Sequence, residues 1–152
     1  MRILGIDFGD SRTGFAISDP LGFGASSLPA CKEKNMVKVA DFTAELVKVQ
    51  GAEQIVLGFP KNMNGSVGPR GEKTKAFFAM LKERLGEEFP IILWDERLTT
   101  VAADRVMDET GVRDHKEYVD EIAAMLILQG YLDRLNAGLP VPGGIEDEDA
   151  DE

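Results

Sequence analysis

The sequence has one cysteine and one histidine among its 152 residues, and this scarcity narrows the chemistry open to it. A single cysteine, Cys31, excludes a disulfide within the chain and is typical of a reducing compartment, so we expect a cytoplasmic protein. A catalytic cysteine would need a basic partner, and His115 is the one histidine available. Pairings of that kind depend strongly on family, so a Cys31–His115 pair is not the interpretation that we favour.

Long apolar runs are absent as well. No run comes near the roughly 18 residues of a membrane-spanning helix, and no stretch has the form of a signal peptide, so we expect no membrane partner. Apolar residues make up 43% of the chain and charged residues 29%, which is ordinary for a globular domain. The length suits one domain, which we expect over residues 1–137, followed by a Pro/Gly break and a disordered acidic tail over 138–152.

Positive charge is scarce overall, since the net charge is −10. This balance argues against a general nucleic-acid-binding protein. The charge is uneven, however: residues 145–152 carry six acids and no base, whereas residues 61–84 carry six bases against two acids. The basic segment is either an ordinary solvated helix face or a surface for a polyanion, and composition alone leaves both open.

Residues 1–19 predict a β-hairpin. An apolar strand ends on Asp7, a turn rich in Gly, Asp and Ser follows, and a second strand covers residues 15–17. The carboxylate of Asp7 then stands at the end of a strand that we expect to be central, where it can hold a metal ion.

The rest of the chain alternates helices and strands, marked by helical spacing, caps and short apolar runs. The expected elements are a third strand within 21–28 ended by Pro29, a helix capped by Asn35 and ended by Gly51, a strand over 54–58, a helix from Pro69 to Gly86, a strand over 91–94, a short helix from Thr99 or Thr100 to about Gly111, and a last helix starting at Asp114. This order predicts an α/β fold: a mixed five-stranded sheet with antiparallel leading strands, then parallel ones, flanked by helices.

Acidic side chains stand at three places where elements meet. Asp7 ends the first strand, Asp95 and Glu96 end the last strand, and Asp120 lies early in the last helix. If they converge, oxygen ligands without His or Cys favour Mg²⁺ or Mn²⁺, and two such ions can hydrolyse a phosphodiester. Each acid also has an ordinary explanation as a turn former or a surface residue, and periodicity cannot show that they meet.

Four motifs occur in a characteristic order and spacing. They are Asp7-Phe8-Gly9 with Arg12 and Gly14; Gly58-Phe59-Pro60 with Asn62, Gly65 and Gly68-Pro69-Arg70; Asp95-Glu96-Arg97-Leu98-Thr99-Thr100; and Val119-Asp120 with Ala123-Ala124 and Ile127-Leu128. Together they resemble the YqgF/RuvX family, from residue 1 to about residue 136. The first motif alone is a weak signal, but the set is highly specific.

The resemblance implies an RNase H-like fold and a nuclease that depends on Mg²⁺ or Mn²⁺. By motif position, Asp7, Glu96 and Asp120 would be the catalytic, metal-binding acids, with Asp95 a neighbour or an alternate ligand. Adjacent side chains on a strand face opposite sides, so strand register decides between Asp95 and Glu96, and we favour Glu96.

The resemblance also implies a nucleic-acid surface. Arg12 and Arg97 would contact phosphate or hold the acids in place. The loop from Asn62 to Arg70 would be a flexible substrate contact. The expected nucleic-acid-binding residues are Arg12, Lys61, Asn62, Asn64, Arg70, Lys73 and Arg97.

The family is associated with 5′-end processing of precursor 16S rRNA in ribosome biogenesis, and with Holliday junction resolution on branched DNA. We therefore expect pre-rRNA or branched DNA as substrate, ribosomal particles as possible partners, and a monomer or a homodimer. A dimer would favour junction resolution, since that reaction cuts two symmetric strands.

Two other classes remain as alternatives. A sugar-kinase or actin-like ATPase also has Asp-x-Gly on a leading hairpin, although such proteins need two lobes and this chain is short. A non-catalytic nucleic-acid-binding factor in ribosome assembly or transcription could keep the same fold, and the full set of acids argues only weakly against it.

Overall fold

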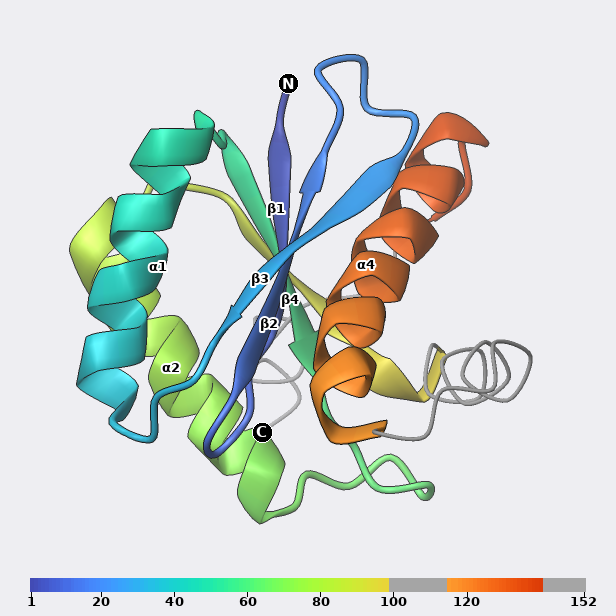
Figure 1. Ribbon diagram of the computed structural model, residues 1–152. Helices are drawn as coiled ribbons and strands as arrows, with labels where there is room; N and C mark the ends of the chain where they lie inside the picture. Colours follow the sequence, from blue (N-terminus) through green and yellow to red (C-terminus); the bar gives the residue numbers. More distant parts are fainter. Residues whose placement is uncertain (99–114, 141–152) are drawn as a thin grey trace.

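The computed structural model describes residues 1–98 and 115–140. A single sheet forms the middle layer, with α1 (Met36–Gln50) and α2 (Pro69–Leu85) on one face and α4 (His115–Asn136) on the other (Figure 1). None of the described helices is both long and apolar enough to cross a membrane.

The sheet has five strands in the order β3-β2-β1-β4-β5. Strands β1 (Ile3–Asp7), β2 (Thr13–Ser18) and β3 (Ala25–Cys31) are antiparallel neighbours. On the other side of β1, β4 (Gln54–Phe59) and β5 (Ile91–Asp95) run parallel to it. The predicted mixed sheet, with antiparallel leading strands followed by parallel ones, is therefore confirmed.

Local signals set most of the helix ends where we expected them. The Asn35 side chain accepts a hydrogen bond from the backbone N–H of Lys38 at 3.1 Å, and so caps α1. Gly51 ends α1 with φ of 65°, a left-handed conformation that glycine adopts without strain. Helix α2 begins at Pro69 and is followed by Gly86. The short helix expected between Thr99 or Thr100 and Gly111 falls outside the described residues.

The third strand differs from our expectation, because it runs through Pro29 rather than ending there. Pairing explains the difference: Leu28 lies opposite Phe15 and Cys31 opposite Thr13, so β3 has one extra residue in this stretch. A proline lacks the N–H that a regular ladder needs, and it is tolerated on an edge strand at such a bulge.

Two apolar cores fill the spaces between the layers. Along β1, Leu4 and Ile6 pack into the core beneath α1 and α2, whereas Ile3 packs with α4. Gly5 also faces α4, since an added Cβ would lie 2.8 Å from Leu128 Cβ. The alternation along the strand therefore directs Asp7 to the α4 side of the sheet.

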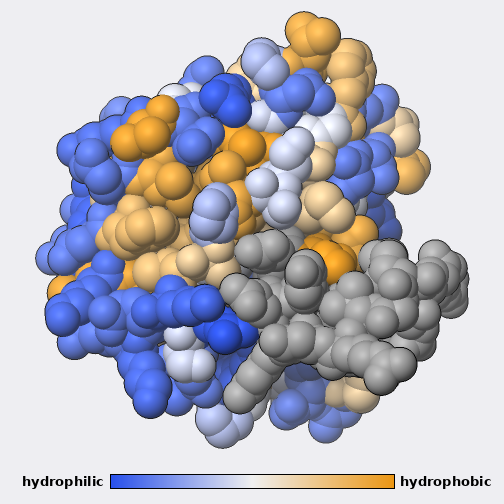
Figure 2. Space-filling view, viewed as in Figure 1, coloured by the Kyte–Doolittle hydropathy of each residue, from blue (hydrophilic) through white to orange (hydrophobic). Residues whose placement is uncertain are grey.

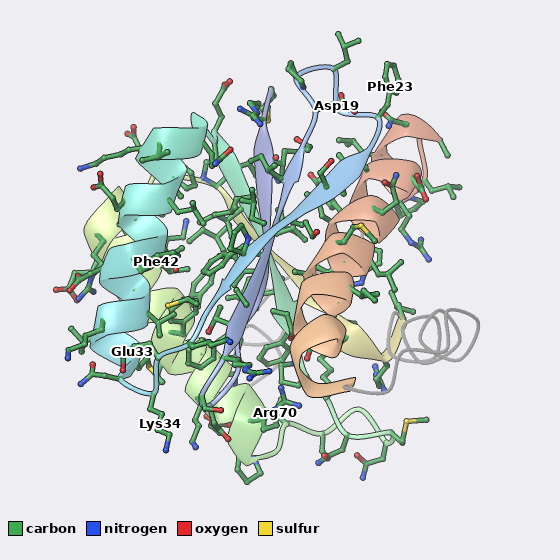
Figure 3. All side chains as sticks on the ribbon, viewed as in Figure 1. Asp19, Phe23, Glu33, Lys34, Phe42 and Arg70 are labelled. Carbon is green, nitrogen blue, oxygen red and sulfur yellow. The ribbon has the colours of Figure 1, made fainter. Side chains whose placement is uncertain are left out.

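The outer face of α1 keeps some apolar side chains at the surface. Figure 2 shows apolar groups between α1 and β3 within a more hydrophilic surround, and Phe42 of α1, labelled in Figure 3, is 43% exposed. Its ring contacts the buried ring of Phe15 at 5.6 Å between centroids. We interpret Phe42 as a cover for the core of the sheet.

Replacing Gly5 by alanine tests the close approach of α4 to β1. The new methyl group would meet Leu128 Cβ at 2.8 Å and the Ala124 carbonyl oxygen at 3.0 Å, so the helix must shift. We expect Gly5→Ala to lower the free energy of unfolding by about 1–3 kcal/mol, measured by urea denaturation. Gly24→Ala is the control, because its nearest neighbour would be 3.5 Å away. Equal stabilities of the two variants would contradict the close packing.

Candidate active site

The carboxyl ends of the three parallel strands lie together at one edge of the sheet. Asp7 ends β1, Phe59 ends β4 and Asp95 ends β5, with Phe59 opposite Asp95 in the register. Ligands of open α/β sheets bind outside the carboxyl ends of the strands. Figure 3 shows Arg70 at this end of the molecule and Asp19 at the opposite end.

Asp7 and Glu96 form a close carboxyl pair on the α4 side of this edge. Asp7 is only 8% exposed, and its side chain lies within hydrogen-bonding reach of Glu96. Gly58 of β4 makes room for the pair, since a Cβ there would lie 2.9 Å from Glu96 Oε1. Burial raises the pKa of Asp7 well above its ordinary value, the neighbouring Glu96 raises it further, and the charge of Arg70 opposes them in part.

Asp95 is paired with Arg97, whereas the adjacent Glu96 lies beside Asp7. Arg97 donates to both Asp95 carboxylate oxygens, with the shortest contact 2.6 Å from Nη2 to Oδ2, and its backbone N–H also donates to Asp95 Oδ1. Partial burial acts to raise the pKa of Asp95, but the hydrogen bonds and charge of Arg97 outweigh it and lower that pKa. Of the two adjacent acids, the structure thus brings Glu96, and not Asp95, to Asp7.

The third expected acid, Asp120, lies on α4, but its side chain belongs to the part of the chain that is not described. Among the described residues, no group of three or more Asp, Glu, His or Cys side chains is placed to hold a metal ion. The described donor set is therefore the Asp7–Glu96 pair. All of its ligand atoms are carboxyl oxygens, which suit Mg²⁺ or Mn²⁺ rather than a softer metal ion.

The loop between β4 and α2, residues 60–68, is ordered by its own polar groups. The Asn62 amide donates to Ser66 Oγ at 2.9 Å, and Ser66 Oγ in turn donates to Asn64 Oδ1 at 2.6 Å. Arg97 Nη1 donates to the Met63 carbonyl oxygen at 3.3 Å. Asparagine side chains thus satisfy the turn from within, while the flexible substrate contact expected over residues 62–70 stays a prediction.

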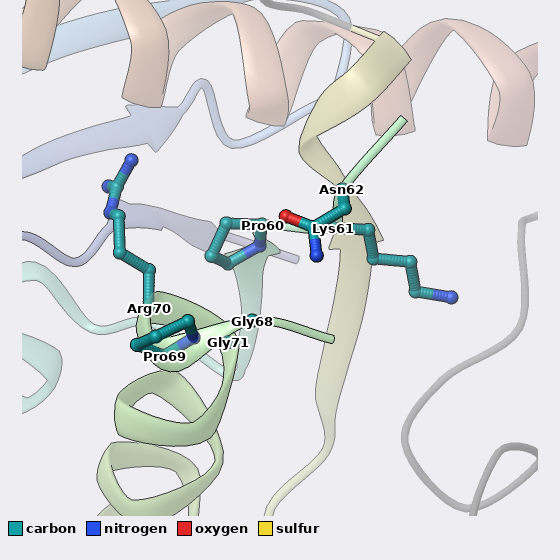
Figure 4. Close-up of a pocket in the computed structure, with 7 residues that line it drawn as sticks. All are labelled: Pro60, Lys61, Asn62, Gly68, Pro69, Arg70 and Gly71. Carbon is teal, nitrogen blue, oxygen red and sulfur yellow. The ribbon is translucent and has the colours of Figure 1, made fainter. Parts of the chain in front are cut away.

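A pocket of about 210 Å³ opens between this loop and the first turn of α2. Its lining residues are Pro60, Lys61, Asn62, Gly68, Pro69, Arg70 and Gly71. Figure 4 shows the Arg70 side chain on one side of the pocket and Asn62 on the other, with the Lys61 side chain extending away from Arg70. The Arg70 side chain and the N-terminus of α2 make the pocket suitable for an anionic group.

The remaining expected nucleic-acid contacts differ in their surroundings. Arg12, in the β1–β2 turn, has a buried Nη1 without a hydrogen-bond partner in the described part of the chain. Lys73 pairs with Asp10 at 3.0 Å, and both side chains are more than half exposed. Lys61 Nζ lies 5.8 Å from the centre of the Phe59 ring. An exposed ion pair such as Lys73–Asp10 is weak, so a phosphate can compete for the lysine.

Two contributors to the site were not identified as such from the sequence. Gly58 appeared only as part of a motif, yet its missing side chain accommodates Glu96. An isolated glycine inside an apolar strand is a recognised signal of close approach and could have identified it. The carbonyl of Met63 carries no sequence signal, because any residue supplies one.

A model of the RuvX family, described as Holliday junction resolvase, matches residues 1–134. The chain belongs to the RuvX family. Its curated relatives include proteins named "Putative pre-16S rRNA nuclease". One, from Acetivibrio thermocellus, is 52% identical over 136 residues, which cover 88% of this chain and 96% of the relative. Another, from Ruminiclostridium cellulolyticum, is 51% identical over 138 residues, 89% of this chain and 96% of the relative.

Solved structures place this RuvX family member in a known fold. RuvC of T. thermophilus in complex with a Holliday junction substrate matches with a TM-score of 0.56 at 15% identity, over 90% of this chain and 96% of RuvC. The fowlpox virus resolvase in complex with Holliday junction DNA matches with a TM-score of 0.54 at 13% identity, over 89% and 99%. The RNase H-like fold implied by the resemblance is confirmed, and so are the family and its nuclease class.

The raised pKa of Asp7 predicts a pH dependence of stability. A carboxyl group with a raised pKa in the folded state contributes stability that is present below its ordinary pKa of about 4 and lost as pH rises through the folded value. Without divalent ions, we expect Asp7→Asn to melt at a higher temperature than the parent at pH 7 and at a similar temperature near pH 4. Addition of Mg²⁺ should raise the melting temperature of the parent only.

The control is Glu53→Gln, which removes an exposed acid just before β4, at the opposite end of that strand from the site. It should keep the pH dependence of the parent. If the melting temperatures of Asp7→Asn and the parent differed by the same amount at every pH between 4 and 8, the pKa of Asp7 would not be raised in the folded protein, and the prediction would be wrong.

Proposed function

We propose that the protein is a divalent-metal-dependent endonuclease that hydrolyses phosphodiester bonds of structured nucleic acid. The observation that carries the proposal is the pairing of buried Asp7 with half-buried Glu96 at the strand ends of a RuvX family chain. Two adjacent carboxyl groups, one of them buried, are poorly stabilised as two anions. A divalent cation would remove that conflict, and it supplies a water of lowered pKa and a positive charge for the leaving oxygen.

Helix α4 supports Asp120 as the third ligand. Asp120 precedes the buried residues Ala124 and Ile127 by four and seven residues, so all three share one stripe of the helix. Ile127 lies beside Gly58, next to Glu96. On this proposal Asp7, Glu96 and Asp120 hold the metal as carboxylates, and Asp95 does not.

The basic groups around the pair would hold the substrate. Arg70 acts electrostatically on Asp7 and lines the pocket, so it can bind a phosphate next to the acids. Arg12 has a buried Nη1 to which no described residue offers an acceptor, and a phosphate oxygen would provide one. Lys61 and Asn62 would hold the strand on the other side of the pocket. These contacts orient the phosphodiester and exclude water, so the reaction begins from a fixed geometry.

For the substrate, we propose precursor 16S rRNA, cut at its 5′ end in the cytoplasm and within ribosomal particles. The names of the relatives, at about half identity over nearly their whole length, support this choice. Branched DNA is the second candidate, supported by the description of the family and by the junction complexes of the structural neighbours.

Cleavage assays test the proposal directly. In Mg²⁺, the parent should cut a precursor 16S rRNA fragment, and Asp7→Asn or Glu96→Gln should be at least ~100-fold slower, because loss of an outer-shell partner alone costs roughly 10–100-fold. Glu53→Gln serves as the control with an unchanged rate. Equal cleavage by Asp7→Asn and the parent would refute the assignment of the acids. A four-way DNA junction assayed in parallel separates the two substrates.

A further inference from the structure

We propose that Asp95 and Arg97 are positioning residues, which together fix the loop of residues 60–68 against the strand end that presents Glu96. This inference rests on the proposed function of the Asp7–Glu96 pair, and it gives Asp95 and Arg97 a role other than metal or phosphate binding. The following contacts lead to it.

The first contact that links the loop to the end of β5 is the ion pair between Arg97 and Asp95. Arg97 binds Asp95 through Nε and Nη2, at 3.0 Å and 2.6 Å, with the two planar groups side by side. The Asp95 side chain is 17% exposed and the Arg97 side chain 32%, so the pair is partly shielded from water. Forked contacts of this kind are directional, and lysine cannot reproduce them.

The second contact joins Arg97 to the loop of residues 60–68. The third guanidinium nitrogen, Nη1, donates to the Met63 carbonyl oxygen across 34 positions of sequence, and it lies 3.7 Å from where a Cβ on Gly65 would be. Lys61 also acts on this pair, since its charge contributes to the lowered pKa of Asp95. One arginine thus joins the end of β5 to the middle of the loop.

These contacts of Arg97 matter because they join the two parts of the active site, the strand end with Glu96 and the loop that lines the pocket. Arg97 directly follows Glu96, while the loop carries Lys61 and Asn62 at the pocket. Within the loop, the Asn62, Ser66 and Asn64 side chains are hydrogen-bonded to one another, so its parts move together. Holding Met63 therefore sets the distance between the pocket and the acids. Arg97 has all three guanidinium nitrogens engaged in protein contacts, which argues against its acting mainly as a phosphate ligand.

The chain offers a matched control in Arg84. Arg84 donates to Asp41 at 2.7 Å and to the Met80 carbonyl oxygen at 3.2 Å, so it makes the same two kinds of contact. It joins α2 to α1 and lies outside the site. Arg84→Ala and Arg84→Lys therefore control for the loss of an arginine with a carboxylate and a carbonyl partner.

Hydrogen exchange of the free, full-length protein gives the first test. The backbone N–H groups of Asn62, Gly65 and Ser66 are hydrogen-bonded within the loop and report on its opening. In Arg97→Ala and Asp95→Asn we expect them to exchange roughly tenfold faster, as for loss of a hydrogen bond to a charged group. Arg97→Lys should exchange as fast as Arg97→Ala, because lysine cannot reproduce the forked contacts, and the Arg84 variants should match the parent. Unchanged exchange in Arg97→Ala would overturn the inference.

Cleavage kinetics give the second test, in the form of a double-mutant cycle. If Asp95 and Arg97 act as one positioning unit, kcat/KM should fall by the same factor, roughly tenfold, in Asp95→Asn, in Arg97→Lys and in the double variant. If Arg97 binds phosphate, Arg97→Lys should retain most activity, and its loss should add to that of Asp95→Asn. Additive losses with unchanged exchange would therefore disprove positioning. If the parent cleaves nothing, the proposed function fails, while the exchange test still decides the inference.

Discussion

The close placement of the Asp7 and Glu96 carboxyl groups is the constraint on which the rest of the structure depends. Two adjacent acids, of which Asp7 is buried, cost free energy when both are charged, so the fold must hold them together by other means. Gly58 leaves the space that Glu96 occupies, and the apolar contact of α4 with β1 keeps that space narrow. The stability of the core is therefore what keeps an unfavourable acid pair intact.

The charge distribution follows from the same constraint. A chain of net charge −10 repels a polyanion at long range, so binding depends on where the few bases lie. Arg70 and Lys61 stand at the pocket, and Arg12 lies in the turn that follows Asp7. In the rest of the basic segment, Arg84 pairs with Asp41 and Lys82 donates to the carbonyl oxygens that follow α2. The basic segment of residues 61–84 thus has a partly structural role.

The sequence predicted the features that local chemistry determines. Asn35, Gly51 and Gly86 act through their own backbone or a near neighbour, and the elements that they bound were correct. The end of β3 was wrong because the bulge at Pro29 arises from pairing with β2, which the local sequence does not encode. Motif order gave the family and the candidate acids. The Arg97–Met63 contact could not be predicted, since it joins distant residues through a backbone carbonyl.

The two adjacent acids at the end of β5 show how one strand end can serve two purposes. Strand alternation ends at Asp95, because Glu96 begins a 3₁₀ turn, so the direction of each side chain depends on its partner. Asp95 already has Arg97 to balance its charge, and a cation would gain little there. Asp7 is buried beside the half-buried Glu96, and the charge of Arg70 opposes the raised pKa of Asp7 in part. Glu96 lies beside Asp7, whereas Asp95 is paired with Arg97, and this difference in placement favours Glu96 over Asp95 as the ligand of a divalent cation.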